Sequence, residues 1–234
     1  MKTYTFICGC GHSGTSLVAN MFASHPDVFI PLRETRAFMR RDAEESTWKA
    51  LVEEAKASGK THFAEKTPRH LLRIKRIRSV VPGARFVVMV RDGRDVAASL
   101  VRRSGTVEDG LERWVHENSA LLRHIGSPDV HVQRYEDLVA NPEQNLQAIC
   151  KFASISWAQE MLEFHKTERL WFGVDQLKKG TGEKGEEHRN RRNWQINQPI
   201  FDGRGQWREL LSPSEASMFS EGKAGRLMKH FGYG

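Results

Sequence analysis

Cysteine is scarce in this sequence of 234 residues, with three residues in all and no Cys-x-x-Cys pair. This scarcity argues against a disulfide framework and against a zinc ribbon. No run of about 18 apolar residues occurs, so the sequence contains no candidate membrane span. Residues 1–7 are too short a stretch, and too soon followed by glycine, to act as a secretory signal. Together these absences predict a cytoplasmic protein.

The composition is that of an ordinary globular protein. Apolar residues make up 39% of the chain and charged residues 28%, which excludes the disordered and fibrous classes. The length suits one domain over residues 1–234 with a substantial core. Lys and Arg total 36 against 29 Asp and Glu, which gives a net charge of +7. Such an excess can attract nucleic acid, an acidic surface or a small phosphorylated ligand, and composition does not choose among them.

Short β-rich runs alternate with helical patterns along the chain. The strongest predicted strand is residues 86–90, whose five consecutive apolar residues are typical of a central parallel strand. Other strands are predicted at residues 4–8, 63–64 and 130–132, and helices at residues 17–23, 46–58, 71–81, 95–103, 111–125 and 143–152, with a last helix capped at 212–215 and running toward 231. The alternation predicts an α/β, three-layer fold with helices flanking a central parallel sheet. Residues 178–193 are charged, glycine-punctuated and poor in apolar residues, which predicts a long surface loop or lid.

A glycine-rich loop, residues 9–16 (GCGHSGTS), lies between the first predicted strand and the first predicted helix. In that position, backbone N–H groups and the helix N-terminus face an anion, and Thr15 and Ser16 add hydroxyl donors. The spacing from Gly9 to Gly14 matches a Walker A loop, but Thr15 stands where that loop has its lysine. The loop therefore predicts anion binding and argues against ordinary nucleotide hydrolysis. A tight turn that binds nothing is the alternative.

A second basic motif follows the strongest strand, at the carboxyl edge where open α/β sheets bind ligands. Arg91 at this position can donate in a forked geometry to a phosphate, and Ser99 lies two helical turns further on. The alternative is that Arg91 and Asp92 form an ion pair that caps the helix. Two anion sites at the tips of neighbouring strands imply a ligand with two separate anionic ends.

Four motifs follow one another in a recognisable order: His12-Ser13-Gly14-Thr15-Ser16-Leu17, Glu65-Lys66-Thr67-Pro68, the block Val88-Met89-Val90-Arg91-Asp92-Gly93-Arg94-Asp95 through Ser99, and Tyr135-Glu136-Asp137-Leu138. Together they resemble the sulfotransferases that use 3′-phosphoadenylyl sulfate (PAPS). The similarity covers roughly residues 4–155 and, more loosely, the region of Trp207. It implies a P-loop-like sulfotransferase fold, transfer of a sulfuryl group from PAPS with PAP as the product, and a small-molecule, glycan or peptide acceptor.

The resemblance also implies roles for individual residues. The 5′-phosphosulfate would be held by Gly11, His12, Ser13, Gly14, Thr15 and Ser16, and the 3′-phosphate by Arg91 and Ser99. Lys66 would reach the oxygen that bridges phosphate and sulfate. Gly205 and Trp207 would belong to the glycine-x-tryptophan element that closes the nucleotide pocket, with Arg204 adding charge. His12 is also a catalytic candidate, because it can donate to the phosphosulfate. Many members carry Arg or Lys at this position, so this end of the site has a weaker cation.

The acceptor hydroxyl needs a base in such a reaction. Glu34 is the first candidate, because Glu34-Thr35-Arg36 resembles the segment that carries the glutamate base in tyrosylprotein sulfotransferases. The alternative is a solvated carboxylate paired with Arg33 or Arg36. His62 and His70, which flank the Lys66 motif, are the reserve candidates.

Three alternative functions stay open at this point. A P-loop nucleotide or small-molecule kinase must explain Thr15 in place of lysine. A basic nucleic-acid-binding protein prefers interleaved surface aromatics, which the six tryptophans here do not provide. A non-catalytic nucleotide-binding protein is a third possibility. No metal is expected, because the sequence has no HExxH motif and Cys8 and Cys10 alone make a poor site.

The excess charge is concentrated in one part of the chain. Residues 66–103 hold eleven basic residues against Asp92 and Asp95, a net charge of +9, so the remaining residues sum to −2. The sequence therefore predicts a positive field around a multiply phosphorylated donor. Residues 178–193, with six basic and three acidic residues, are predicted to cover the donor or to receive an anionic acceptor.

Overall fold

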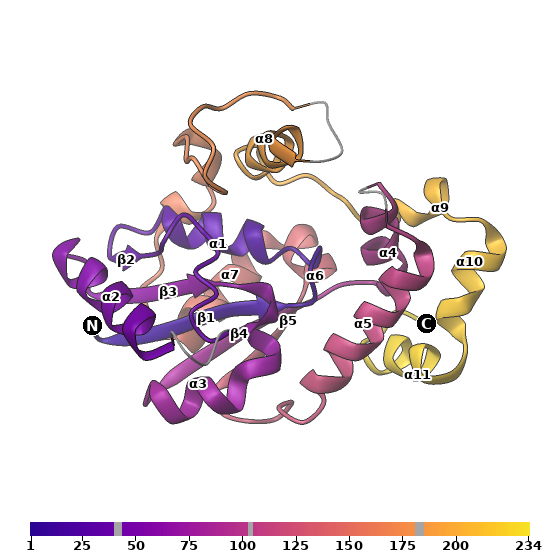
Figure 1. Ribbon diagram of the computed structural model, residues 1–234, viewed down its shortest axis with the longest axis horizontal. Coiled ribbons are helices and arrows are strands. Elements are labelled where there is room, and N and C mark those ends of the chain that lie inside the picture. The colour runs from indigo at the N-terminus through magenta and orange to yellow at the C-terminus, as the bar shows by residue number, and fades with distance from the viewer. Residues whose placement is uncertain (40–43, 103–104, 181–184) are drawn as a thin grey trace.

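Five parallel strands form the centre of the computed structural model, which describes residues 1–39, 44–102, 105–180 and 185–234. The strands are β1 Thr3–Gly9, β2 Val28–Phe29, β3 His62–Lys66, β4 Ala84–Val90 and β5 Val130–Arg134, in the spatial order β2-β3-β1-β4-β5. Ile7 of β1 pairs with Lys66 on one side and Val87 on the other. The predicted α/β class and parallel sheet are confirmed (Figure 1).

Helices lie on both faces of this sheet (Figure 1). The α-helices are α1 Thr15–Ala23, α2 Glu44–Ala57, α3 Ile74–Val80, α4 Gly93–Val101, α5 Val107–Leu121, α6 Tyr135–Ala140, α7 Pro142–Ala153, α8 Gly185–Ile196, α9 Trp207–Leu210, α10 Pro213–Ser217 and α11 Gly222–His230. Short 3₁₀ helices are η1 Pro68–Arg73, η2 Gln159–Met161, η3 Phe164–Lys166 and η4 Met218–Ser220. No helix of the described ranges is long and apolar enough to cross a bilayer.

Alternation along the strands divides the core into two layers. Phe6 and Phe86 point to one face and pack with side chains of α2, α3, α4, α5 and α11. Ile7 and Val87 point to the other face and pack with side chains of α1, α6 and α7. Because both faces are covered, β1 and β4 read as nearly continuous apolar runs in the sequence, and this is why their prediction succeeded.

Several predicted boundaries were wrong, for local reasons. The helix expected at 71–81 begins as η1, with Pro68 in its first turn, and becomes α3 only at Ile74. The helix expected at 111–125 is α5, which starts earlier because Thr106 and Asp109 form a capping box. The predicted last helix is divided into α10, η4 and α11, although its cap at Ser212 is confirmed.

The largest correction concerns residues 178–193. Most of the predicted loop is the helix α8, which lies above α1 in Figure 1. Residues 181–184 of that prediction, and Arg103 of the helix expected at 95–103, lie outside the described residues. The helix α8 has no apolar stripe, and polar contacts hold it instead. The Asn193 side chain accepts the backbone N–H of Trp171 at 2.7 Å, and Asn20 of α1 donates to the carbonyl of Ile196 at 2.6 Å.

Candidate functional site

The carboxyl ends of β1, β3 and β4 meet at one edge of the sheet, because the three strands are parallel and adjacent. The glycine-rich loop follows β1, Lys66 is the last residue of β3, and Arg91 follows β4 directly. Three motifs that are distant in the sequence therefore lie side by side. This is the edge where open α/β sheets bind ligands.

The glycine-rich loop depends on glycine at two positions. Gly9 has φ 145°, and a Cβ atom there would collide with the carbonyl oxygen of Met89. Gly14 has φ 91°, and a Cβ atom would lie 2.8 Å from the ring of Tyr135. The turn brings the chain into α1 at Thr15, so the N-terminus of this helix adjoins the loop. The predicted strand–loop–helix arrangement is confirmed.

Ser13 supports an anion in this loop. Its side chain is fully buried, and its Oγ has no hydrogen-bond partner among the described residues. A buried hydroxyl without a partner is costly unless a ligand or water supplies one. The Ser13 hydroxyl in this loop therefore fits the phosphate end of a donor such as PAPS.

A cavity of about 700 Å³ opens above this edge. Among the described residues, seven arginines and a single carboxylate line it: Arg36, Arg69, Arg91, Arg102, Arg113, Arg191 and Arg192, with Glu34. They come from segments spread over most of the chain, including η1, α5 and α8. The cavity is therefore strongly cationic, and a polyanionic ligand suits it.

Of the predicted donor-binding residues, most line this cavity. They are Gly11, His12, Gly14, Thr15, Ser16, Arg91 and Ser99. Ser13 is a buried residue of the loop, and Lys66 lies behind Glu34. The sequence-derived candidate base, Glu34, is also on the cavity wall.

Glu34 and Lys66 form a close ion pair. The Lys66 Nζ donates to Oε1 of Glu34 at 2.9 Å; the lysine side chain is 0% exposed and the glutamate 23%. Arg33 pairs instead with Glu54 on the surface, so the expected alternative in which Glu34 pairs with Arg33 is wrong. Phe172 lies beneath the ammonium, with 5.1 Å from Nζ to the ring centroid. The pair thus joins a buried cation to a carboxylate that reaches the cavity.

Burial and the neighbouring charges shift the pKa values of this pair in opposite directions. Burial alone would raise the pKa of Glu34, but the positive charges of Lys66, Arg192 and Arg36 outweigh it and hold this pKa below its ordinary value. Burial lowers the pKa of Lys66, against the raising influence of Glu34. Glu34 is therefore ionised at neutral pH, as a general base must be.

Arg91 is held at the other end of the cavity by backbone carbonyls. Its Nη1 donates to the carbonyl of His12 at 3.1 Å, and its Nη2 donates to that of Gly203. The guanidinium stacks on Tyr135, 4.4 Å from the ring centroid. Its Nε has no partner among the described residues, which leaves a donor for an anion.

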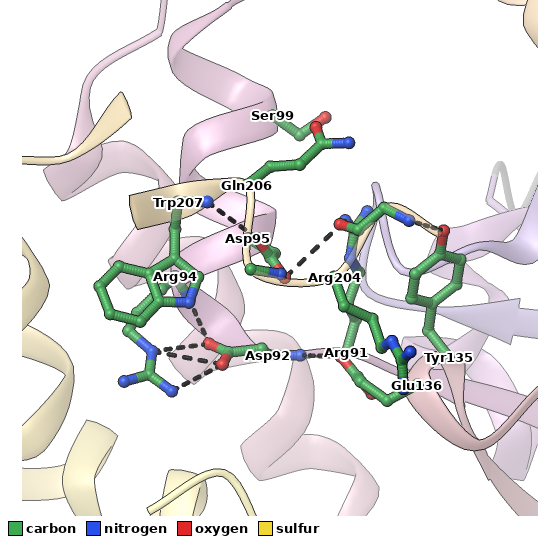
Figure 2. Close-up of polar contacts among 12 residues, drawn as sticks. Arg91, Asp92, Arg94, Asp95, Ser99, Tyr135, Glu136, Arg204, Gln206 and Trp207 are labelled. Carbon is green, nitrogen blue, oxygen red and sulfur yellow. Dashed lines mark hydrogen bonds and ion pairs between the residues drawn. The ribbon is translucent and has the colours of Figure 1, made fainter. Parts of the chain in front are cut away.

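The ion pair that the sequence allowed between Arg91 and Asp92 does not form. Asp92 caps α4 by accepting the backbone N–H of Arg94 at 2.9 Å, and it pairs with the Arg94 side chain at 2.7 Å. Figure 2 shows this pair. Arg91 instead lines the cavity and has Asp95 as its nearest carboxylate, at 3.9 Å.

Asp95 fixes the segment 201–207 to α4 (Figure 2). Its buried carboxylate accepts the N–H of Gly205 at 2.8 Å and that of Trp207 at 3.0 Å, and one oxygen lies 3.9 Å from Nη2 of Arg91. Asp95 belongs to the third sequence motif, but no role was predicted for it. One carboxylate therefore ties the segment 201–207 to the arginine at the end of the cavity.

The three predicted residues of this segment do not line the cavity. Arg204 is exposed and pairs with Asp202 at 2.6 Å. The Trp207 indole packs against Arg94, 4.3 Å from the guanidinium carbon to the ring centroid. The backbone N–H of Gly205 donates to the Asp95 carboxylate. Gln206, between them, lines the cavity in their place.

We expect Asp95→Asn to loosen this segment. An amide has one oxygen, so one of the two N–H groups loses its acceptor, at a cost of about 1–3 kcal/mol in the free energy of unfolding. Chemical unfolding measures the loss, and limited proteolysis should show faster cleavage within residues 201–207. Asp202→Asn is the matched control, since its carboxylate is exposed and its loss costs little. Equal stability and cleavage in the two variants would contradict the role of Asp95.

The reserve histidines lie elsewhere. His70 is fully buried and contacts Glu65 at 2.8 Å, and its Nε2 accepts the N–H of Phe38. His62 is at the opposite end of β3, where it hydrogen-bonds to Thr3 at 2.8 Å. Neither is among the residues that line the cavity.

Sequence reasoning missed several cavity residues. Tyr135 belongs to the fourth motif but was given no role at the site, yet it lines the cavity and its ring contacts the Arg91 guanidinium. Arg36, Arg113, Arg191 and Arg192 were not predicted as site residues. Arg36 belongs to the Glu34-Thr35-Arg36 motif but was given no role in binding, and the charge density of residues 178–193 was the only signal for Arg191 and Arg192. No motif marks Arg113.

The comparisons with known proteins agree with this geometry. A domain of the curacin biosynthetic pathway, a sulfotransferase by its title, superposes with a TM-score of 0.63 at 18% identity over 100% of this chain and 99% of that one. A mouse sulfotransferase complexed with PAP gives 0.60 at 16% identity over 99% and 89%. The fold is thus the P-loop-like fold of sulfotransferases.

The sequence carries the assignment further. The Sulfotransferase family pattern matches residues 39–159, about half of the chain, and the chain belongs to this family. Protein-tyrosine sulfotransferase 2 of Gallus gallus is 28% identical over 195 residues, covering 67% of this chain and 52% of the relative. The protein-tyrosine sulfotransferase of Drosophila melanogaster is 27% identical, covering 67% and 39%. The chain spans about half the length of the curated relatives it matches, or less.

Proposed function

We propose that this chain transfers a sulfuryl group from PAPS to an acceptor hydroxyl or amine and releases PAP. The observation that carries the proposal is the Glu34–Lys66 pair on the wall of a cavity lined by arginines, beside a glycine-rich loop. A mouse sulfotransferase with the same fold is titled as complexed with PAP. No cluster of three or more possible metal ligands occurs among the described residues.

The donor would lie along the strand edge. The glycine-rich loop and the N-terminus of α1 suit the 5′-phosphosulfate, with the buried Ser13 hydroxyl as a further donor. Arg91 and Ser99 suit the 3′-phosphate at the other end. His12 links the two, because its Nδ1 lies 3.0 Å from Oγ of Ser99. Gly205 and Trp207 would act through the position of Gln206, because both donate their backbone N–H groups to Asp95 on either side of it.

In the reaction, the acceptor oxygen forms a bond to sulfur while the bond from sulfur to the bridging phosphate oxygen breaks. Glu34 takes the proton of the acceptor hydroxyl. The Lys66 ammonium stabilises the negative charge that develops on the leaving oxygen. Because the two side chains are paired, the base and the stabilising cation are held on the same side of the cavity.

The acceptor is a small molecule, a glycan or a peptide. The relatives are named as protein-tyrosine sulfotransferases, so a phenolic hydroxyl is the first acceptor to assay. The helix α8, which contributes Arg191 and Arg192 to the cavity, would face the donor or an anionic acceptor.

Calorimetric titration tests the donor site. We expect PAP to bind without a divalent metal and more tightly than ATP with Mg²⁺. Arg91→Ala should weaken PAP binding by roughly tenfold or more, the effect of losing a charged hydrogen bond. Arg123→Ala, which removes an exposed arginine just after α5, is the control. Preferential binding of ATP with Mg²⁺ would overturn the proposal in favour of a kinase.

A further inference from the structure

The glycine-rich loop contains no lysine or arginine of its own. Its one basic side chain, His12, hydrogen-bonds to Ser99, on the side assigned to the 3′-phosphate. A doubly anionic phosphosulfate at this loop would therefore meet backbone N–H groups and hydroxyls, but no fixed cation from the loop itself. A cation from another element would complete the site.

The helix α5 presents such a cation. Arg113 and Glu117 lie one turn apart on α5, and the Nε of Arg113 is 3.4 Å from Oε1 of Glu117. The other oxygen of Glu117 accepts the backbone N–H of Gly11 at 3.3 Å. The Glu117 side chain is 3% exposed, so its charge is compensated inside the protein.

The Arg113 guanidinium lies directly against Gly11. A Cβ atom on Gly11 would collide with Nη2 of Arg113, so a larger residue at this position would displace the end of the guanidinium. Both residues line the cavity. Arg69 also approaches Glu117, at 3.6 Å, but its side chain is 59% exposed. Two guanidinium groups share one carboxylate, which leaves a net positive charge beside the loop.

We propose that Arg113, positioned by Glu117, supplies a second fixed positive charge, besides that of Lys66, for the phosphosulfate end of the donor. Arg113 is then a donor-binding residue, and Glu117 is a positioning residue that sets the guanidinium and orients Gly11. The inference rests on the proposed function, since it assigns a further residue to the same donor site. It explains how a loop without lysine or arginine binds a doubly charged group.

Binding of two probes separates the two ends of the site. PAP carries both the 5′- and the 3′-phosphate, whereas 3′-AMP carries only the latter. Arg113→Gln should weaken PAP binding by roughly tenfold or more and leave 3′-AMP binding within about twofold. Arg91→Ala should weaken both probes. Arg123→Gln, the loss of an exposed arginine near the same helix, should change neither.

The role of Glu117 is tested by the ratio of the affinities for PAP and for 3′-AMP. Glu117→Gln can still accept the Gly11 N–H but no longer pairs ionically with Arg113, so PAP should lose affinity relative to 3′-AMP. A merely structural role would weaken both probes together. Arg113→Lys, which keeps the charge and loses the forked geometry, should recover part of the PAP affinity. Thermal unfolding of every variant shows whether it is folded.

The outcomes distinguish this inference from the proposed function. Suppose that the wild-type protein binds PAP. If Arg113→Gln then binds PAP equally tightly, or if its affinities for PAP and for 3′-AMP fall by the same factor, the role of Arg113 is overturned and the proposed function stands. If wild-type protein binds no PAP, both are overturned.

Discussion

Glu34→Gln is expected to reduce sulfuryl transfer by about 10²–10⁴-fold, the usual contribution of a general base. Glutamine keeps the shape of the side chain and can still accept a hydrogen bond from Lys66, whose Nζ lies 2.9 Å from Oε1. It cannot take the proton of the acceptor. Initial rates with PAPS and a phenolic acceptor measure the loss.

Binding and chemistry should separate in this variant. The affinity for PAP should stay within about threefold of wild type, well below the tenfold expected for a lost charged contact. Glu54→Gln, which removes a surface carboxylate paired with Arg33, is the matched control and should be fully active. Unchanged turnover in Glu34→Gln would remove Glu34 from the role of base.

Lys66→Gln is expected to lower kcat by about 10²–10³-fold, the effect of removing a preorganised donor at a developing negative charge. It should also move the pH profile. In the wild type, the Lys66 charge helps to hold the pKa of Glu34 below its ordinary value, so the base stays ionised into acid. Without that charge, burial dominates and raises the pKa of Glu34. The acidic limb of the kcat profile should therefore shift toward neutral pH.

The shift of the acidic limb is the sharper readout, because a structural defect would lower kcat without moving it. Lys56→Gln is the control, since Lys56 is exposed and pairs with Glu53. The buried lysine has a lowered pKa as well, so wild-type activity should begin to fall at a pH below the ordinary pKa of lysine. A lowered kcat with an unmoved acidic limb would contradict the electrostatic coupling of the two residues.

Much of the fold was accessible to sequence reasoning because its signals are local. The apolar runs of β1 and β4 reflect strands covered on both faces, and the glycines of the loop reflect backbone angles that other residues avoid. Parallel strand order then places Lys66 and Arg91 at one edge. These features need only short stretches of chain to be recognised.

The helix α8 shows why other parts were missed. Hydrophobic periodicity is the main helix signal in a sequence, and this segment has none. Buried asparagines, among them Asn193, hold it through hydrogen bonds to the backbone of distant residues. Such contacts exist only once the chain has folded, so the segment was predicted as a loop.

The charge distribution was predicted in outline and corrected in detail. Residues 66–103 supply Arg69, Arg91 and Arg102 to the cavity, together with Lys66 behind Glu34. Others in that stretch are used elsewhere, such as Arg78, which pairs with Asp129 at 2.6 Å. The remaining cavity arginines come from outside it, on α5, on α8 and beside Glu34.

The sequence by itself determined the parallel α/β architecture, the anion loop and the pair of strand-end residues, since each follows from a local pattern. Only the tertiary structure decided that Glu34 pairs with Lys66, that Asp95 anchors the segment 201–207, and that Arg113 lies against Gly11. These contacts join residues from separate elements. Their positions depend on how helices pack around the sheet, which no short stretch of sequence specifies.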